Sequence, residues 1–313
     1  MKRREHGFVL VAVIWMLAIL TVLAIGFGRR ALLEQRAAAL SIDHTRTQHL
    51  ARGAVEYGIA YMRNQALVQQ LVEQYGGDSY IAVYQTQKNM LTEGNFFDLG
   101  SDALLENDQV TFTLEDAEGK ISLNSAPREI FDEIDILSFT TVSAILRRRG
   151  GPLGNDEPMP FLAIDEARLL EGISDSDWYG SKDRPGLRDL FTIYGDGRVN
   201  VNTAPREVLE SLPDLDPAVA AVVLSYRAGA DGEMETADDR RFQDVEEIAS
   251  VTGVRMNDLE PIARFCKFES EYFTITGFAT LRQGKVRAVS KATVQVANGT
   301  ATVLNWSEGD FGS

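Results

Sequence analysis

The sequence predicts an α+β protein in which one very long N-terminal helix packs on an antiparallel sheet interrupted by a large all-α insertion. Three observations lead to this fold class. An uncharged stretch near the N-terminus runs directly into a helical pattern, strand patterns occur in two places far apart, and the chain between them repeats itself. With 313 residues there is room for two folding units beyond the first helix.

The uncharged stretch is Phe8–Gly28, which is 21 residues long. As a helix it would span about 31 Å, enough to cross a bilayer core of about 30 Å. A short basic segment, Lys2–Gly7, precedes it, and Arg29 and Arg30 follow it without a break. Three interpretations compete: a cleaved secretory signal, a plain membrane anchor, and a segment processed at Gly7–Phe8. The apolar core is longer than that of a secretory signal and no small-x-small cleavage site follows it, which opposes the first.

A helical pattern continues from the apolar stretch to about Asn64. It consists of small and apolar residues that recur at helical spacing: Leu33, Ala37, Leu40, Ala51, Ala54, Gly58 and Tyr61. Leu67–Val72 can extend the helix, and Gly76-Gly77 ends it. We expect its upper half to pack on the sheet and its lower half to remain available to other helices. The alternative is a surface helix with a narrow apolar stripe.

Strand patterns flank the middle of the chain. On the N-terminal side Val110, Phe112 and Leu114 alternate with polar residues, and Ile121 and Leu123 follow the turn at 116–119. On the C-terminal side we predict three strands, around residues 273–275, 286–296 and 301–306, with turns at 282–284 and 298–299. The residues between the two regions are poor in strand signals, which indicates a sheet with a helical insertion. Residues 78–108 give no clear pattern.

The insertion contains an internal repeat. Residues 119–127, GKISLNSAP, match residues 197–205, GRVNVNTAP, and residues 161–173 match residues 242–254. Each copy reads as a short strand, an Asn-Ser/Thr-Ala-Pro helix start, a pair of helices, a phenylalanine and a further helix closed by Gly172 or Gly253. A proline in the first turn of a helix, with a hydroxyl residue before it, is favourable capping chemistry.

Composition excludes some classes of function. The net charge is −15, which repels phosphate backbones and opposes nucleic-acid binding. The single cysteine, Cys266, lies between Phe265 and Phe268 and is expected to be a buried apolar residue. We find no catalytic constellation and expect no enzyme, because His44 and His49 are poorly spaced for a metal and no phosphate loop, nucleophile elbow or HExxH motif is present.

An acidic loop at 230–241 is the sharpest candidate site. It holds five carboxylates within nine residues: Asp231, Glu233, Glu235, Asp238 and Asp239. Hard oxygen ligands at this density suit Ca²⁺, and Gly232 allows a tight bend, although the spacing is not that of an EF-hand. The corresponding loop of the first copy has only Asp156 and Glu157. The two interpretations are a calcium site and a solvated acidic loop.

The join Gly7-Phe8 resembles the processing site of type IV pilins and type II secretion pseudopilins. In that family a prepilin peptidase cuts after the glycine and methylates the new N-terminus, here Phe8. The family usually has a glutamate at the fifth mature position, where this chain has Ala12. A carboxylate in the apolar phase is costly and needs a partner, which the family finds in the adjacent subunit of the fibre. A subunit at the tip has no such neighbour, so Ala12 fits the tip and resembles the K family of minor pseudopilins.

The repeat resembles helix-hairpin-helix modules, which occur in DNA-binding proteins and, with paired Asn-Thr-Ala-Pro segments, in the inserted α-domain of the K family. DNA-binding hairpins present glycine N–H groups to a phosphate. At that turn the chain has residues 213–216, PDLD, and residues 134–137, IDIL, without glycine and with aspartates. Use of the module as a scaffold is therefore favoured over DNA binding.

The resemblance implies a pilin-like fold divided into a leader at 1–7, a transmembrane part at 8–28, a helix with first strands at 29–118, a helical domain of two helix-hairpin-helix-like repeats at 119–266, and C-terminal strands at 267–313. It implies a minor pseudopilin that caps and initiates the periplasmic pseudopilus, is anchored once in the inner membrane, and has its bulk in the periplasm. Minor pseudopilins I, J and H and the prepilin peptidase would be its partners. A membrane-anchored DNA receptor is the alternative, and a periplasmic hydrolase is a weaker third.

Overall fold

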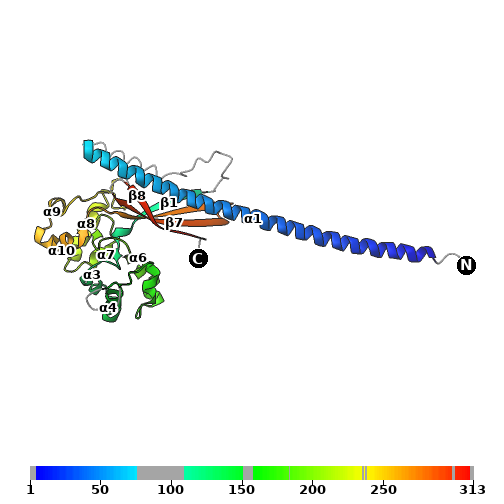
Figure 1. The fold of residues 1–313 in the computed structure, drawn as a ribbon, viewed down its shortest axis with the longest axis horizontal. Helices are drawn as coiled ribbons and strands as arrows, with labels where there is room; N and C mark the ends of the chain where they lie inside the picture. Colours follow the sequence, from blue (N-terminus) through cyan, green and yellow to red (C-terminus); the bar gives the residue numbers. More distant parts are fainter. Residues whose placement is uncertain are drawn as a thin grey trace.

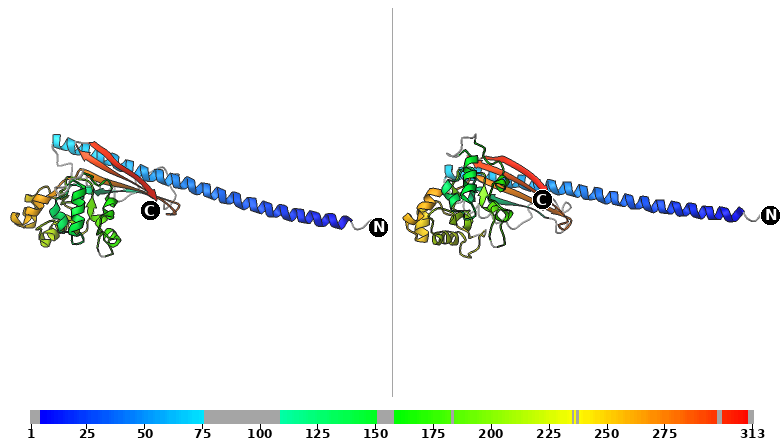
Figure 2. Two further views of the ribbon diagram at one scale, coloured as in Figure 1. Left: turned by 60° about the horizontal axis from the view of Figure 1, so that its bottom comes forward. Right: turned by 90° about the horizontal axis from the view of Figure 1, so that it is seen from below.

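The fold was obtained as a computed structural model, which describes residues 5–75, 109–150, 158–182, 184–234, 236, 238–297 and 300–310. A single helix, α1, projects far beyond the rest of the molecule, and the sheet and the helical insertion gather at its C-terminal end (Figure 1). The insertion lies at the end of the sheet remote from the N-terminus, as two further views confirm (Figure 2).

Helix α1 runs from Glu5 to Tyr75 and is 71 residues long. The apolar stretch and the amphipathic stretch are thus one continuous helix, as the sequence predicted. The predicted end at Gly76-Gly77 and the segment 78–108 lie outside the described residues. The upper half of the helix covers one face of the sheet, where Ala51, Ala54 and Val55 are fully buried.

The main sheet has four antiparallel strands in the order β1-β6-β7-β8. Their bounds are Gln109–Asp116, Tyr272–Leu281, Val286–Ala297 and Thr300–Asp310. The first strand therefore pairs with one that follows it by more than 150 residues, which confirms the prediction of a sheet with an insertion. The predicted turn at 298–299 lies outside the described residues.

Helix and sheet approach closely where both carry glycine. A Cβ atom on Gly58 of α1 would lie 2.6 Å from Ile275 Cγ2, and one on Gly277 of β6 would lie 2.3 Å from the carbonyl oxygen of Ala51. Such contacts are closer than side chains allow, so the absence of a Cβ at both positions sets the spacing between the two layers. The lower part of the predicted stripe behaves differently, because Leu33 and Leu40 are more than half exposed.

The insertion between β1 and β6 is built around its own apolar core, which includes Phe131, Phe161, Trp178, Phe191 and Phe242. The elements of its first half are η1 (Ala117–Gly119), β2 (Ile121–Ser122), α3 (Arg128–Asp132), α4 (Phe139–Arg148), η2 (Ile164–Leu169), α5 (Asp175–Tyr179), α6 (Leu187–Leu190) and β3 (Phe191–Thr192). Those of its second half are β4 (Val199–Asn200), α7 (Arg206–Glu210), α8 (Pro217–Arg227), α9 (Val245–Thr252), η3 (Met256–Leu259), α10 (Glu260–Phe265) and β5 (Cys266–Lys267).

Each copy of the repeat closes on itself through a short parallel strand pair. In the first copy β2 pairs with β3, and in the second β4 pairs with β5. The strand expected around Ile121 and Leu123 therefore belongs to the insertion and does not join the main sheet. Parallel pairing needs a long crossover, which the helices of each copy supply.

The two copies differ in their last aligned element. A helix is present there in both copies, but the second copy has the α-helix α9, whereas the first has the 3₁₀ helix η2. Asp244 precedes α9, and its side chain accepts a hydrogen bond from the Glu247 N–H. The equivalent residue before η2 is Ala163, which has no side-chain oxygen to cap the helix. Both copies then end at a glycine with positive φ, Gly172 or Gly253.

Candidate functional site

The lower half of α1 exposes a continuous apolar surface. Its large side chains from Leu10 to Phe27 are 47–70 % exposed. The helix contains a window with a mean hydropathy of 2.7, none of which is buried in the structure. By length and composition it is a candidate for a single membrane span. A surface of this size left in water would aggregate, so it needs lipid or other apolar helices around it.

The predicted processing residues lie at the start of this surface. Gly7 and Phe8 are in the first turns of α1, whose described part begins at Glu5, and the rest of the predicted leader lies outside the described residues. Ala12 follows one turn later and is exposed on the helix. All three thus belong to the N-terminal end of α1, and this end of the helix lies away from the sheet and the insertion (Figure 1).

A second candidate site is the junction at which the chain passes from the sheet into the insertion and back. Asp116, the last residue of β1, connects the segment that enters the insertion with the segment that returns from it to the sheet. Its Oδ2 accepts hydrogen bonds from Thr203 Oγ1 at 2.6 Å, Ser270 Oγ at 2.7 Å and Asn200 Nδ2 at 2.9 Å. One carboxylate therefore connects the sheet, the second copy of the repeat and the returning chain.

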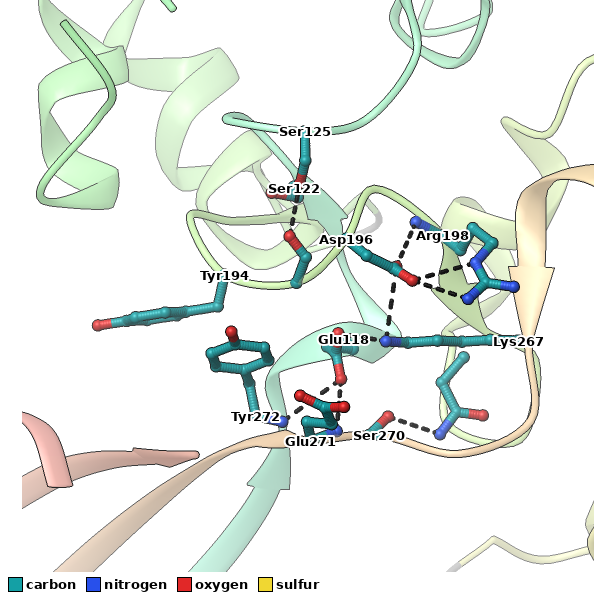
Figure 3. Close-up of polar contacts among 12 residues, drawn as sticks. Glu118, Ser122, Ser125, Tyr194, Asp196, Arg198, Lys267, Ser270, Glu271 and Tyr272 are labelled. Carbon is teal, nitrogen blue, oxygen red and sulfur yellow. Dashed lines mark hydrogen bonds and ion pairs between the residues drawn. The ribbon is translucent and has the colours of Figure 1, made fainter. Parts of the chain in front are cut away.

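Glu118 holds the same junction from two residues further on (Figure 3). Its side chain is 1 % exposed and forms an ion pair with Lys267 through Oε1. Its Oε2 accepts hydrogen bonds from the backbone N–H groups of Glu271 at 2.6 Å and Tyr272 at 3.3 Å. A buried carboxylate that is paired and fully hydrogen-bonded fixes geometry, because any displacement leaves a charge unsatisfied.

The junction extends to the link between the two copies. Asp196 lies 3.5 Å from Lys267 Nζ and 2.8 Å from Arg198 Nη2. Burial opposes ionisation of Asp196, but the hydrogen bonds from Arg198 and the charge of Lys267 outweigh it and lower the pKa of Asp196. Tyr194 stacks on Tyr272 beside this cluster, with ring centroids 5.8 Å apart. The arrangement provides mechanical coupling between the insertion and the sheet.

Sequence reasoning missed this junction. Residues 116–119 were expected to form a turn, and acidic residues in a turn are usually solvated. Nothing in their local pattern indicates that the partners lie more than 80 residues away in the chain. The sequence offers one signal, which is the place of the two acids at the boundary between the predicted strand and the first copy of the repeat.

The acidic loop is organised by its own hydrogen bonds. Asp238 Oδ2 accepts from the backbone N–H groups of Ala230 at 2.5 Å and Asp231 at 3.2 Å, and Asp238 Oδ1 accepts from Thr236 Oγ1 at 2.8 Å. The hydrogen bond from Thr236, followed by those from the backbone, lowers the pKa of Asp238 to about 2. Thr236 Oγ1 also lies 3.4 Å from Asp239 Oδ1, and Glu235 lies outside the described residues.

Within the described part of the chain, no three His, Cys, Asp or Glu side chains converge in a way that could hold a metal ion. The negative charge of Asp239 acts on the buried guanidinium of Arg227, whose pKa burial lowers to about 10. Asp231 Oδ1 accepts a hydrogen bond from the Glu233 N–H at 2.8 Å. The described carboxylates thus do not form a calcium site among themselves, and calcium binding stays a prediction.

Taken together, the long helix laid on one face of an antiparallel sheet, with a helical domain inserted after the first strand, is a pilin-like α+β fold. No protein-family model matches the chain, and no curated protein matches it either. The chain is similar in structure to a chain in the crystal structure of the GspK–GspI–GspJ complex from the type 2 secretion system of enterotoxigenic Escherichia coli. The TM-score is 0.51, over 85 % of this chain and 99 % of that one, at 16 % sequence identity. The similarity is one of fold, and it confirms the predicted fold class.

Proposed function

We propose that this chain is a structural subunit, a minor pseudopilin of the K kind in a type II secretion system, and not an enzyme. The observation that carries the proposal is the joint presence of an exposed apolar half-helix, an antiparallel sheet and a bulky helical insertion. A chain of the GspK–GspI–GspJ complex has a similar fold over 85 % of this chain, which supports the proposal. In this role the chain caps the tip of the periplasmic pseudopilus and initiates its assembly.

The apolar half of α1 anchors the subunit once in the inner membrane before assembly, with the sheet and the insertion in the periplasm. Prepilin peptidase cuts after Gly7 and methylates Phe8. The lower half of α1 then packs against the helices of minor pseudopilins I and J, and of H below them. The exposure of the large side chains from Leu10 to Phe27 supports this use of the helix, since nothing in the described part of the chain covers them.

Two features favour the tip over the body of the fibre. Ala12 stands where other subunits of the family have a glutamate that pairs with the N-terminal amine of an adjacent subunit. This chain therefore lacks the carboxylate that would pair with a subunit above it. The insertion also extends well to the side of the helix axis (Figure 2). A head of this width does not fit inside a fibre whose helices are packed side by side, whereas a tip has room for it.

The deciding experiment is mass spectrometry of the N-terminus of the protein purified from membranes. We expect the wild-type chain to begin with N-methylated Phe8 and the Gly7→Val variant to keep its full length. Immunogold labelling of the wild type should mark the ends of fibres only. Retained Met1 in the wild type, or label along the length of fibres, contradicts the proposal. An Ala38→Val variant, altered at an exposed position of the helix beyond the apolar stretch, serves as the matched control and should be processed normally.

The two hairpin turns, both within the described residues, do not favour the alternative of a membrane-anchored DNA receptor. Asp216 accepts a hydrogen bond from the Ala218 N–H at the start of α8, and Ser138 accepts one from the Thr141 N–H at the start of α4. The helix starts that would meet a phosphate are thus capped by the chain itself. A shift of duplex DNA by the purified protein at physiological salt would revive this alternative.

Calcium binding by the loop at 230–241 belongs to the same proposal as a separate, testable property. Calorimetry should detect Ca²⁺ binding that is lost in the double variant Asp238→Ala, Asp239→Ala and kept in Glu207→Ala, Glu210→Ala on α7. If the wild type gives no heat of binding, the loop is a solvated acidic segment and the role in the pseudopilus is unaffected.

A further inference from the structure

We call the sheet together with its insertion the head. The region between the apolar stretch and the near end of the head is basic, although the protein as a whole is acidic. Residues 29–52 of α1 lead from the apolar stretch to this end of the head, where Asp43 meets residues 281–288 around the β6–β7 turn, and residues 307–310 at the end of β8 lie beside that turn. Together they contain eight Lys or Arg and four Asp or Glu, a net charge of +4, which leaves −19 for the rest of a chain of −15. We call the following side chains the basic collar: Arg29, Arg30, Arg36, Arg46, Arg282, Lys285 and Arg287.

The β6–β7 turn presents part of the collar in a fixed position. Arg282 forms an ion pair with Asp43 of α1, which ties the turn to the helix. Arg282 and Gln283 have φ values of 52° and 58°, and Gly284 follows at 80°, so the turn is held in a conformation that non-glycine residues seldom adopt. Lys285 and Arg287 are exposed beside it.

Positive charge on this side of the apolar stretch runs against the usual rule for membrane proteins. Cytoplasmic flanks normally carry the excess of Lys and Arg. Here Lys2, Arg3 and Arg4 precede the stretch, and Arg29, Arg30 and Arg36 follow it, so the two flanks are equal. Cations on an exported flank hinder insertion, and their presence indicates a use on the exported side.

We propose that the basic collar binds anionic phospholipid headgroups of the leaflet from which α1 emerges, so that the head rests on the membrane until the subunit joins a fibre. This inference rests on the proposed membrane anchoring of α1. Attraction between Lys or Arg and anionic lipid acts over about one Debye length, which is about 8 Å at physiological ionic strength. The collar is continuous with the membrane-spanning stretch, and its charge is complementary to that surface.

The reach of the collar is consistent with this contact. Asp43, to which the turn is tied, lies 15 residues beyond Gly28, or about 22 Å along the helix axis. A headgroup layer adds roughly 5–8 Å beyond the hydrocarbon core. Transmembrane helices tilt by up to about 40°, and a tilt toward the sheet side brings the turn to within about a Debye length of the headgroups. Arg29 and Arg30 reach them without any tilt.

The test uses the full chain in lipid nanodiscs, with a fluorophore on Gln283→Cys in a Cys266→Ser background and a quencher on the lipid headgroups. We expect stronger quenching in discs that contain phosphatidylglycerol than in discs of phosphatidylcholine alone, and the difference should fall as salt is raised. The variant Lys285→Gln, Arg287→Gln should weaken the head–membrane association about fivefold for each cation removed. The matched control, Arg255→Gln, Arg264→Gln at the far end of the insertion, should leave quenching unchanged.

Equal quenching in the two lipids, or quenching that the Lys285→Gln, Arg287→Gln variant does not alter, overturns the inference and leaves the proposed function intact. If the lipids behave alike while that variant fails to support fibre assembly, the collar serves an acidic protein surface instead, and the lipid proposal is equally overturned. A chain that does not enter the discs removes the membrane role of α1 and this inference together.

Discussion

The side chain of Asn202 forms hydrogen bonds with both the N–H and the carbonyl group of Phe242. Its Oδ1 accepts a hydrogen bond from the Phe242 N–H, and its Nδ2 donates one to the Phe242 carbonyl oxygen, each at 2.8 Å. Asn124 does the same with Phe161, at 2.8 and 3.0 Å. In each copy Nδ2 also donates to a carbonyl of the closing segment, that of Ile193 or Phe268. The asparagine of the Asn-Ser/Thr-Ala-Pro segment is therefore the internal brace of each repeat.

Replacing Asn202 by Ala should lower the free energy of unfolding by about 3 kcal/mol, because it leaves several main-chain groups without partners. Phe242 is 2 % exposed, so water does not easily replace the lost bonds. Chemical denaturation of the detergent-solubilised chain measures the effect. Asn124→Ala should cost a similar amount, whereas Asn305→Ala, on the exposed side of β8, should cost little. Equal effects of all three variants would contradict the assigned role.

Two glycines of α1 give a second prediction. Replacement of a helical glycine by alanine favours the helix, but it destabilises the protein where the added Cβ has no room. Gly53→Ala should stabilise the protein by up to about 1 kcal/mol, because an added Cβ would have no atom within 4 Å. Gly58→Ala should destabilise it by about 1–3 kcal/mol, because its Cβ would meet Ile275 Cγ2 at 2.6 Å. Thermal unfolding of the two variants checks the sign of each change. Stabilisation by Gly58→Ala would mean that the helix and sheet are not in close contact there.

The ion pair between Glu118 and Lys267 predicts strong coupling. Lys267→Met should cost about 3–5 kcal/mol, because it leaves the 1 % exposed carboxylate without its counter-charge. The double variant Glu118→Gln, Lys267→Met should cost less than the sum of the single changes, since no buried charge remains. A double-mutant cycle by chemical denaturation measures the difference. Additive single changes would show that the pair does not hold the junction.

Much of the fold follows from periodicity. The continuity of α1 and the places of strands β6, β7 and β8 could be predicted because each carries a sustained pattern that tertiary contacts reinforce. Strands β6 and β8 nevertheless extend to Leu281 and Asp310, beyond the predicted segments 273–275 and 301–306. The repeat could be recognised because both copies keep the residues of their brace, Asn124 and Asn202. The 3₁₀ form of η2 could not be predicted, because it depends on the lack of a capping side chain at Ala163. Between the two copies of the repeat, that position is only one of several that differ.

The junction could not be predicted, for a different reason. Asp116 and Glu118 act through partners such as Asn200, Ser270 and Lys267, which the fold brings together from distant parts of the chain. Local propensity contains no information on such pairings. The acidic loop is a different case. Its local composition predicts a calcium site, which stays a prediction, whereas the hydrogen bonds that Asp238 accepts from the loop itself could not be predicted from composition.

Cys266 should be unreactive in the folded protein. It is 3 % exposed, and burial raises the pKa of its thiol to about 12. Iodoacetamide at pH 8 should therefore leave the native chain unlabelled and modify it after denaturation. Because the folded thiol pKa is raised, its contribution to stability is present below the usual thiol pKa and is lost as the pH rises above that value. Rapid labelling of the native chain would show that β5 opens readily.

Asp238 gives a prediction at the other end of the pH scale. The hydrogen bonds from Thr236 and from the backbone lower the pKa of Asp238 to about 2 in the folded chain. A lowered carboxyl pKa stabilises the fold above the usual aspartate pKa, and this stabilisation is lost as the pH falls toward about 2. Asp238→Asn should therefore melt at a lower temperature than the wild type at neutral pH, and the difference should vanish near pH 2.

Melting curves recorded between pH 7 and pH 2, with a chelator present to remove divalent ions, measure this difference. Thr236→Val removes the hydrogen bond that lowers the pKa of Asp238 most, which comes from the Thr236 hydroxyl oxygen 2.8 Å away. In that variant the loss of stability should begin at a higher pH than in the wild type, because the Asp238 pKa moves back toward its usual value. If wild type and Asp238→Asn melt in parallel over the whole pH range, the carboxylate does not organise the loop.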